Sequence, residues 1–184
     1  FRRVLFRSGV AGNGLGVVWG DFDDSGTIDI FVANDGNPNH CFFGRGDGTF
    51  EEVAKSRGVY LASDGNTRAG MGVVAGDPDA DGDLDILVVN LRNQFDSFFR
   101  NEAGFFVEET NKTGLGPITR RTTRFGVGFL DVDNDSNLDL YEASGRVMIR
   151  KDAPKGDPFK ENNHLLLGDD RGRFADRKST RLNS

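Results

Sequence analysis

The chain has 184 residues, 28% of them charged, and a formal net charge of -6. The sequence contains no apolar run long enough to cross a membrane and no basic stripe suited to nucleic acid, so we expect neither a membrane span nor a nucleic-acid partner. The single cysteine, Cys41, excludes an internal disulfide and is expected to be a small buried apolar residue in a strand.

The two ends of the sequence differ from the rest. Residues 1–8 and 177–184 fit no repeat and resemble translated sequencing-adapter read-through. We therefore expect both to be artefactual tails that carry no information about fold or function. The residues between them carry a repeated pattern.

Residues 9–63 form the first unit of this pattern. Two short runs rich in β-branched and aromatic residues, 16–20 and 28–33, flank an acidic segment and are predicted to be strands. A third apolar run at 41–43, a glycine-containing turn and Phe50 then predict a β-hairpin. The unit therefore predicts four strands with an acidic loop between the first two.

The same order of elements returns in residues 64–120 and 121–176. In the last unit the third strand comes later than expected, so the polar stretch 146–163 is predicted to be an inserted loop. Four-stranded units in series are typical of β-propellers, so we predict an all-β fold, a partial propeller of three blades. Because propellers close with more blades than three, we expect further blades elsewhere in a longer chain. The later strands are predicted at 72–76, 84–89, 97–99 and Phe106 in the second unit, and at 126–130, 138–141, 164–167 and Phe174 in the third.

The acidic segments at 21–29, 77–85 and 131–139 share the spacing Asp-x-Asp-x-[Asp/Ser]-x-x-x-Asp and lie 56 and 54 residues apart. Calcium takes six to eight oxygen ligands at about 2.3 to 2.6 Å, and a curled loop turns alternate side chains toward one such ion. A solvated acidic turn is the alternative, but three copies in one frame favour metal sites. The predicted ligands are Asp21, Asp23, Ser25, Thr27 and Asp29 in the first loop, Asp77, Asp79, Asp81, Asp83 and Asp85 in the second, and Asp131, Asp133, Asp135, Asn137 and Asp139 in the third.

Differences among the loops predict an order of calcium affinity. The second loop has aspartate at all five odd positions and Gly82 at the sharp turn, so it should bind most tightly. The first loop has Ser25 in place of a carboxylate, and the third has Ser136 where the turn calls for glycine. We expect the third site to be strained or weaker.

These loops are not EF-hands. An EF-hand needs a bidentate glutamate at position 12 and a helix on each side. Position 12 is Val32 in the first loop and Val88 in the second, and Glu142 in the third is the one candidate. The flanking sequences predict strands, so each loop is expected to join the first two strands of a blade.

The chain resembles the FG-GAP-like, or VCBS, repeat family, and within it the cartilage acidic protein (ASPIC) type. The segments that carry the resemblance are GVVWGDFD at 16–23, DIFVAN at 29–34 and GDGTF at 46–50. The resemblance implies propeller blades with up to three structural calcium ions and a secreted or surface module that binds protein or carbohydrate, as in cell adhesion. Calcium loops of modest affinity favour an extracellular, periplasmic or cell-surface location, with a signal peptide in the longer protein.

Two further motifs have simpler explanations than function. Arg45-Gly46-Asp47 spells an adhesion tripeptide, but Gly-Asp-Gly is ordinary turn chemistry on a hairpin tip. His40 and His164 precede third strands and are expected to be connection residues. Six phenylalanines are expected to pack between blades, namely Phe42, Phe43, Phe50, Phe98, Phe99 and Phe106.

The alternative function is enzymatic. Some calcium-dependent polysaccharide lyases use propellers with similar loops, and there a basic residue abstracts a proton from an acidic sugar. Arg68, Arg124 and Tyr141 lie near predicted strand ends and are the candidates for such a role. No nucleophile with a matching base is evident in the sequence, so we expect a non-catalytic module.

Overall fold

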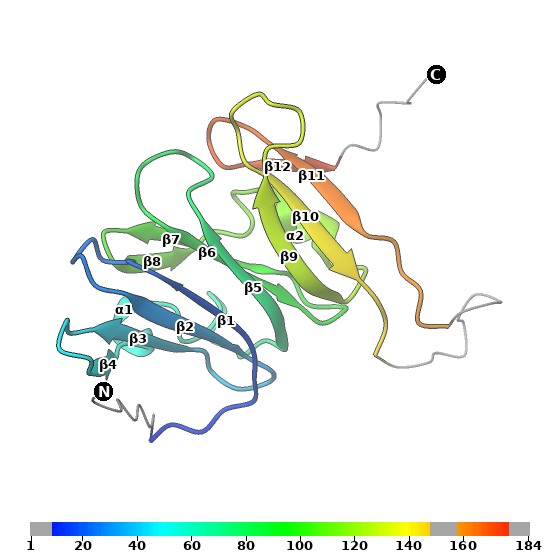
Figure 1. Cartoon of the computed structure of the whole chain (residues 1–184). Coiled ribbons are helices and arrows are strands. Elements are labelled where there is room, and N and C mark those ends of the chain that lie inside the picture. Colours follow the sequence, from blue (N-terminus) through cyan, green and yellow to red (C-terminus); the bar gives the residue numbers. More distant parts are fainter. Residues whose placement is uncertain (1–8, 148–157, 177–184) are drawn as a thin grey trace.

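The computed structural model describes residues 9–147 and 158–176. The tails expected at 1–8 and 177–184 lie outside these residues, as does the middle of the insertion predicted at 146–163. The described residues form three four-stranded antiparallel sheets and two short helices, which confirms the all-β class. Figure 1 shows the sheets side by side in chain order. No helix in the described part of the chain is long and apolar enough to span a membrane.

Each sheet is a simple meander whose strands pair in sequence order. The first sheet contains β1 (Gly14–Gly20), β2 (Asp29–Asn34), β3 (His40–Gly44) and β4 (Phe50–Glu52), followed by α1 (Ala54–Arg57). The second contains β5 (Gly70–Gly76), β6 (Asp85–Asn90), β7 (Ser97–Glu102) and β8 (Phe105–Glu108), followed by α2 (Leu115–Thr119). The third contains β9 (Arg124–Leu130), β10 (Asp139–Ser144), β11 (His164–Gly168) and β12 (Phe174–Asp176).

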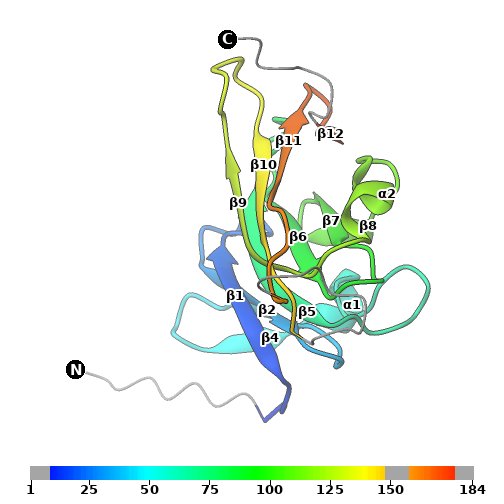
Figure 2. The same ribbon diagram turned by 90° about the vertical axis from the view of Figure 1, so that its right-hand side faces the viewer.

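The sheets contact one another through their first strands, since β5 lies against both β1 and β9. Both helices lie on the opposite side of the molecule, away from β1 and β9 (Figure 2). The close approach of β5 to β9 depends on Gly72, where an added Cβ would lie 1.9 Å from the carbonyl oxygen of Phe125.

The core has two parts, one on each side of the second sheet. Strand β6 lies between them, with Ile86 and Val88 in one cluster and Leu87 in the other. This position explains the continuous apolar run in β6, because both of its faces are covered. The cluster toward the first sheet includes Phe22, Phe31, Cys41, Phe43, Phe99 and Phe106, and the cluster toward the third includes Phe98, Leu115, Leu140, Leu166 and Phe174.

Burial bears out most of the predicted core. Cys41 is fully buried, and its burial raises the pKa of the thiol far above the usual range. Five of the six predicted phenylalanines are buried. The prediction was wrong for Phe50, which is half-exposed because it begins the three-residue edge strand β4 beside the hairpin tip.

Strand β7 is shifted by one residue relative to the spacing of the other repeats. Ile30 of β2 pairs with Phe42, whereas its counterpart Ile86 pairs with Phe99. The strand predicted at 97–99 is therefore too short, because β7 continues through Glu102 and the turn is Ala103-Gly104, both at positive φ. As a result Arg100 stands where the first sheet has Phe43, and Asn101 stands where it has Gly44.

We predict that Gly72→Ala destabilises the fold by about 1–3 kcal/mol, because the new methyl group collides with the backbone of β9. Gly128→Ala is the matched control, since an added Cβ there has no neighbour within 4 Å. Urea unfolding in the presence of calcium measures both free energies. Equal stability of the two variants would contradict the close packing of β5 on β9.

Candidate metal sites in the three acidic loops

The acidic loops connect the first and second strands of each sheet and follow one another along one edge of the molecule (Figure 1). All three curl in the same way, because the aspartate at position 1 accepts hydrogen bonds from the backbone amides of positions 5 and 6. In the first loop Asp21 accepts them from Ser25 and Gly26 at 3.0 and 2.7 Å. The other loops repeat these bonds at Asp77 (3.1 and 3.0 Å) and Asp131 (3.2 and 3.0 Å).

The curl also requires left-handed backbone at position 6. Gly26 and Gly82 have φ of 79° and 100°, as their predicted role in the turn requires. Ser136 has φ of 73°, so the third loop places a side chain in a conformation that costs roughly 1–2 kcal/mol. The predicted strain in this loop is therefore present. Position 4 is also left-handed in every loop, which the sequence did not suggest.

The aspartate at position 9 is buried in every loop and fastens the loop to the rest of its sheet. Asp29 accepts hydrogen bonds from the amide of Phe22 in the loop (2.9 Å) and from the amide of Gly44 at the end of β3 (2.8 Å). Asp139 accepts equivalent bonds from Val132 and Gly168, both at 2.9 Å. One carboxylate thus joins the start of the loop, the start of the second strand and the end of the third strand.

The second loop replaces one of these bonds with an ion pair. Pro78 has no amide hydrogen to offer Asp85, so one carboxylate oxygen accepts instead from the guanidinium of Arg100 at 2.9 Å. The other accepts from the amide of Asn101 at 2.7 Å. Arg100 also pairs with Asp79. A fixed positive charge therefore lies inside the second acidic loop, a feature that the one-residue shift of β7 concealed from sequence analysis.

Three carboxylates converge in each loop, with oxygen atoms within 4.8 Å of one another. Ligands about 2.4 Å from one shared calcium ion would have this spread, and an all-oxygen set suits a hard cation. In addition, Asp79 Oδ1 is buried and has no hydrogen-bond partner among the described residues. The converging sets are Asp21, Asp23 and Asp29, then Asp77, Asp79 and Asp81, then Asp131, Asp133 and Asp139.

The remaining predicted ligands lie outside these sets and make local bonds. The hydroxyls of Ser25 and Thr27 are 2.8 Å apart, and that of Thr27 also donates to the carbonyl of Gly44. Asp83 accepts from the amide of Ala103 on the β7–β8 turn at 2.9 Å. In the third loop, Asp135 accepts from both nitrogens of Asn137 at 2.8 and 3.0 Å.

The electrostatics of the loops disfavour bare carboxylates. Burial raises the pKa of Asp29, against the opposing effect of the amides of Gly44 and Phe22. Burial likewise raises the pKa of Asp79, and it raises that of Asp85 to about 7 although Arg100 and the amide of Asn101 oppose the shift. A bound cation would favour the ionised forms and remove this cost.

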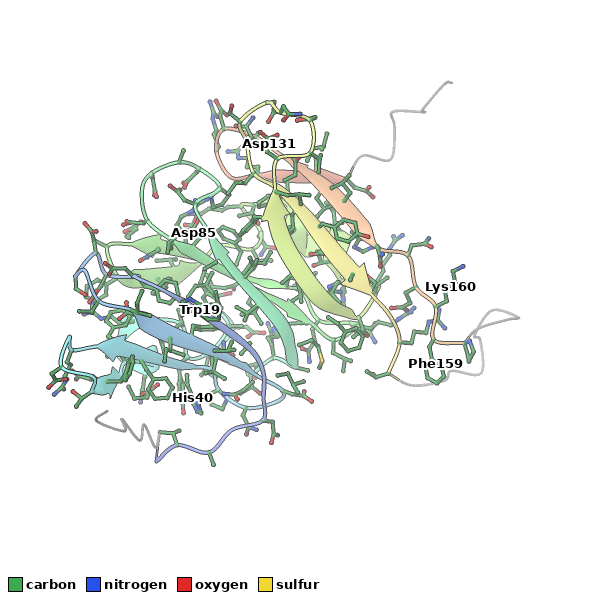
Figure 3. The ribbon with its side chains drawn as sticks, in the orientation of Figure 1. Trp19, His40, Asp85, Asp131, Phe159 and Lys160 are labelled. Carbon is green, nitrogen blue, oxygen red and sulfur yellow. The ribbon has the colours of Figure 1, made fainter. Side chains whose placement is uncertain are left out.

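Hairpins from the next sheet cover the first two loops. Gly104 on the β7–β8 turn lies against Asp23, where an added Cβ would be 2.7 Å from its Cβ. Gly172 on the β11–β12 turn lies against Arg100 and Asp79 in the same way. Side chains in the third loop are more exposed, and Figure 3 shows Asp131 at the outer end of the array.

Glu142 is not a position-12 ligand. It is fully buried on β10, where one oxygen lies 3.1 Å from Nδ1 of His164. His164 and His40 are the first residues of β11 and β3, so their prediction as connection residues was wrong. His40 is buried, with its ring edge-on to Phe42 at 5.9 Å.

The tripeptide at 45–47 lies on the β3–β4 hairpin, where turn chemistry accounts for it. Arg45 pairs with Glu51 across the hairpin at 2.8 Å, and Asp47 accepts a hydrogen bond from the amide of Thr49 at 2.8 Å. Bonds from Thr49 hold the pKa of Asp47 below its ordinary value. The tripeptide therefore needs no adhesive role to explain its presence.

The three candidates for proton abstraction have separate structural roles. Arg124 is completely buried and paired with Asp96, so a substrate has no access to it. Arg68 pairs with Asp64 at 2.8 Å, and the hydroxyl of Tyr141 accepts a hydrogen bond from Asn163 at 2.8 Å. These contacts give the enzymatic alternative no support.

Known proteins resemble this chain over most of its length. A family model described as an FG-GAP-like repeat matches residues 21–88 and 77–142. Cartilage acidic protein 1 of Xenopus tropicalis is 33% identical over 132 residues, covering 70% of the chain and 19% of that protein. The human protein of this name is 40% identical over 91 residues, covering 48% of the chain and 13% of that protein, and the mouse protein is 30% identical over 128 residues. The chain thus spans less than a fifth of the length of these relatives.

The raised pKa of Asp85 predicts how stability without calcium depends on pH. Between the ordinary pKa of about 3.9 in the unfolded chain and about 7 in the fold, the unfolded chain has released a proton that the folded chain keeps. The free energy of unfolding in calcium-free buffer should therefore fall as pH rises from about 4 to about 7. Thermal melts across this interval measure the slope.

Asp85→Asn, which keeps the shape of the side chain but does not titrate, is the control for that slope. It should flatten the dependence on pH in the same buffer. A melting temperature that rises with pH in the original chain would contradict the assignment, as would an unchanged slope in the variant.

Proposed function

This chain belongs to the FG-GAP-like repeat family, of the cartilage acidic protein (ASPIC) type, and we propose that it is a calcium-stabilised, non-catalytic binding module built as part of a β-propeller. The observation that carries this proposal is the architecture that the three acidic loops share. In each, a buried aspartate fastens the loop to the third strand, and three carboxylates of the loop converge.

In this proposal calcium is held mainly by the converging carboxylates. The aspartates at positions 1 and 3 supply one oxygen each in every loop, and the buried aspartate supplies another in the first and third loops. When bound, the ion would supply the positive charge that these groups lack. The chain's own residues orient the ligands, since the amides at positions 5 and 6 fix the first carboxylate. Calcium then stabilises the folded chain because the unfolded chain has no such preformed set.

Arg100 supplies part of that positive charge in the second loop. Its guanidinium contacts two of the five predicted ligands, Asp79 and Asp85. The predicted rank of this loop as the tightest calcium site rests on its five aspartates. The ion and Arg100 repel each other, so the affinity of this site depends on how far Arg100 moves aside.

The propeller part of the proposal rests on one open sheet face. Leu15, Val17 and Trp19 on β1 are 58%, 56% and 66% exposed, and Figure 3 labels Trp19. Their counterparts Val73 on β5 and Val127 on β9 pack against the preceding sheet. We infer that this face of β1 packs against a further blade of the longer protein, which would cover the apolar side chains.

A secreted or cell-surface location fits this proposal, because calcium loops of modest affinity are filled where calcium is about millimolar. There the module would present its loops to a protein or carbohydrate partner. An adhesive role follows the same reasoning, while fold alone does not decide the ligand.

Calcium removal tests the structural role of the ion. One site with a hundredfold excess of calcium over its dissociation constant stabilises the fold by about 2.7 kcal/mol, so chelation should lower the melting temperature by several degrees. Asp23→Asn and Asp79→Asn should each lose part of the increase in melting temperature that calcium gives. Asp64→Asn, which lies outside the loops, should keep this increase. Identical melts with calcium and with EDTA would overturn the proposal.

Arg100→Met tests the competing charge in the second loop. Methionine removes the positive charge but keeps an unbranched side chain, so calcium should bind this loop on the order of tenfold more tightly. Arg45→Met, on an exposed hairpin, is the control and should leave calcium affinity unchanged. Calorimetric titration with calcium measures both variants. If Arg100→Met binds calcium more weakly, the second site requires the guanidinium, and the proposed repulsion between Arg100 and the ion is wrong.

A further inference from the structure

A cleft of 520 Å³ lies at the junction of the second and third sheets. One wall is the β6–β7 connection and the other is α2 with the segment that leads into β9. Gly116 of α2 lies between the side chains of Asn111 and Phe95, and an added Cβ would be 2.7 Å from Asn111 Oδ1. The cleft-forming side chains are Arg92, Asn93, Phe95, Asn111, Arg120 and Arg121.

The charge of this cleft is opposite to that of the chain. Three arginines line it and none of its lining residues is acidic, although the net charge of the whole chain is -6. Arg92 pairs at 3.0 Å with Glu161, which is nearly buried and shared with Arg146 at the same distance. One carboxylate therefore serves two guanidinium groups, and the region keeps a positive charge.

The other two arginines are available to a ligand. Arg120 and Arg121 are exposed, and the guanidinium of Arg120 lies 5.4 Å from the centre of the Phe95 ring. Within the described residues, the side chain of Arg121 has no ion pair or hydrogen bond. A guanidinium offers five donors in a planar fork that matches the oxygens of carboxylate and sulfate groups.

A buried ion pair holds the two walls together. Arg124 is fully buried, and its guanidinium pairs with Asp96 of the first wall through Nε at 3.0 Å and through Nη2. It also donates to the carbonyls of Thr119 and Thr122, which belong to the second wall. A backbone bond from Asn93 to Arg120 at 2.9 Å joins the same two segments. The backbone positions from which the arginines extend are therefore set by the fold.

Within the described residues, this set of three arginines is present at only one of the two sheet junctions. At the junction of the first and second sheets, the positions equivalent to Arg92, Arg120 and Arg121 by the repeat spacing hold Gly36, Asn66 and Thr67. The arginines are thus not required by the repeat itself.

We propose that this cleft binds an anionic saccharide through its sulfate or carboxylate groups. The arginines would hold the anionic groups, and the amides of Asn93 and Asn111 would bond to hydroxyls. The partly exposed ring of Phe95, which lies beside the guanidinium of Arg120, offers apolar surface to the C–H side of a sugar ring. An acidic peptide would use the arginines but would leave this arrangement of amides and ring without a role. The inference rests on the proposed binding function and names its ligand class.

The experiment titrates the full chain in about 1 mM calcium and about 0.15 M salt with four probes. These are a sulfated tetrasaccharide prepared from heparin, an unsulfated chondroitin tetrasaccharide that carries carboxylates alone, inorganic sulfate and a polyglutamate peptide. At least one tetrasaccharide should bind, and which one binds identifies the anionic group. Binding of neither tetrasaccharide overturns the proposal. Equal or tighter binding of polyglutamate or of inorganic sulfate overturns it as well.

Two variants locate the site. Arg120→Gln/Arg121→Gln should weaken tetrasaccharide binding on the order of tenfold or more, because two charge-assisted contacts are lost. Arg45→Gln/Lys55→Gln removes the same charge from the β3–β4 hairpin and α1. It should change affinity less than about twofold, because salt screens charges that are distant from the cleft. If both variants lose the same tetrasaccharide affinity, the saccharide is attracted by the overall charge of the chain and not by this cleft. That result would overturn the assignment. Melting temperatures of both variants verify that they fold.

The calcium proposal and this inference fail separately. Melts that depend on calcium, together with a tetrasaccharide that does not bind, would remove the inference and leave the structural role of calcium. If the Arg120→Gln/Arg121→Gln variant weakens tetrasaccharide binding but calcium does not change the melting temperature, the saccharide site stands and the structural role of calcium falls.

Discussion

The structure depends on one buried carboxylate that recurs in each sheet. Asp29, Asp85 and Asp139 are nearly or fully inaccessible to solvent. Each accepts a hydrogen bond from a backbone amide at the end of the third strand of its sheet. The other carboxylate oxygen accepts from an amide at the start of the loop in the first and third sheets, and from Arg100 in the second. A buried carboxylate is stable only when its oxygens are satisfied. The need to satisfy these oxygens therefore fixes the path of the acidic loop, and the loop in turn gathers the outer carboxylates that a cation would join.

The second sheet shows how this constraint tolerates a change in sequence. Pro78 removes an amide donor, and Arg100 replaces it with a charged one because β7 is shifted by one residue. The same shift places Asn101 where its side chain bonds to the carbonyl of Phe22 in the first acidic loop, at 2.8 Å. Loop geometry and the contact between sheets are thus coupled, and we expect cation binding to stabilise the junctions as well as the loops.

Sequence reasoning was strongest where spacing alone carries the information. The repeated acidic motif, its flanking strands and the need for left-handed backbone at Gly26, Gly82 and Ser136 all follow from local pattern. The arginine cleft and the roles of Arg100 and Arg124 depend on contacts between segments that are distant in sequence. No periodicity marks such contacts, so a buried Arg124 was indistinguishable from a candidate catalytic residue, and Glu142 from a candidate ligand.

Calorimetric titration of the calcium-free chain with calcium at neutral pH tests the central claim most directly. The account predicts saturable binding at up to three sites, with release of protons because the pKa of Asp85 lies near 7 without the ion. No saturable binding would contradict the claim that these loops are calcium sites. Binding without any gain in melting temperature would contradict their structural role.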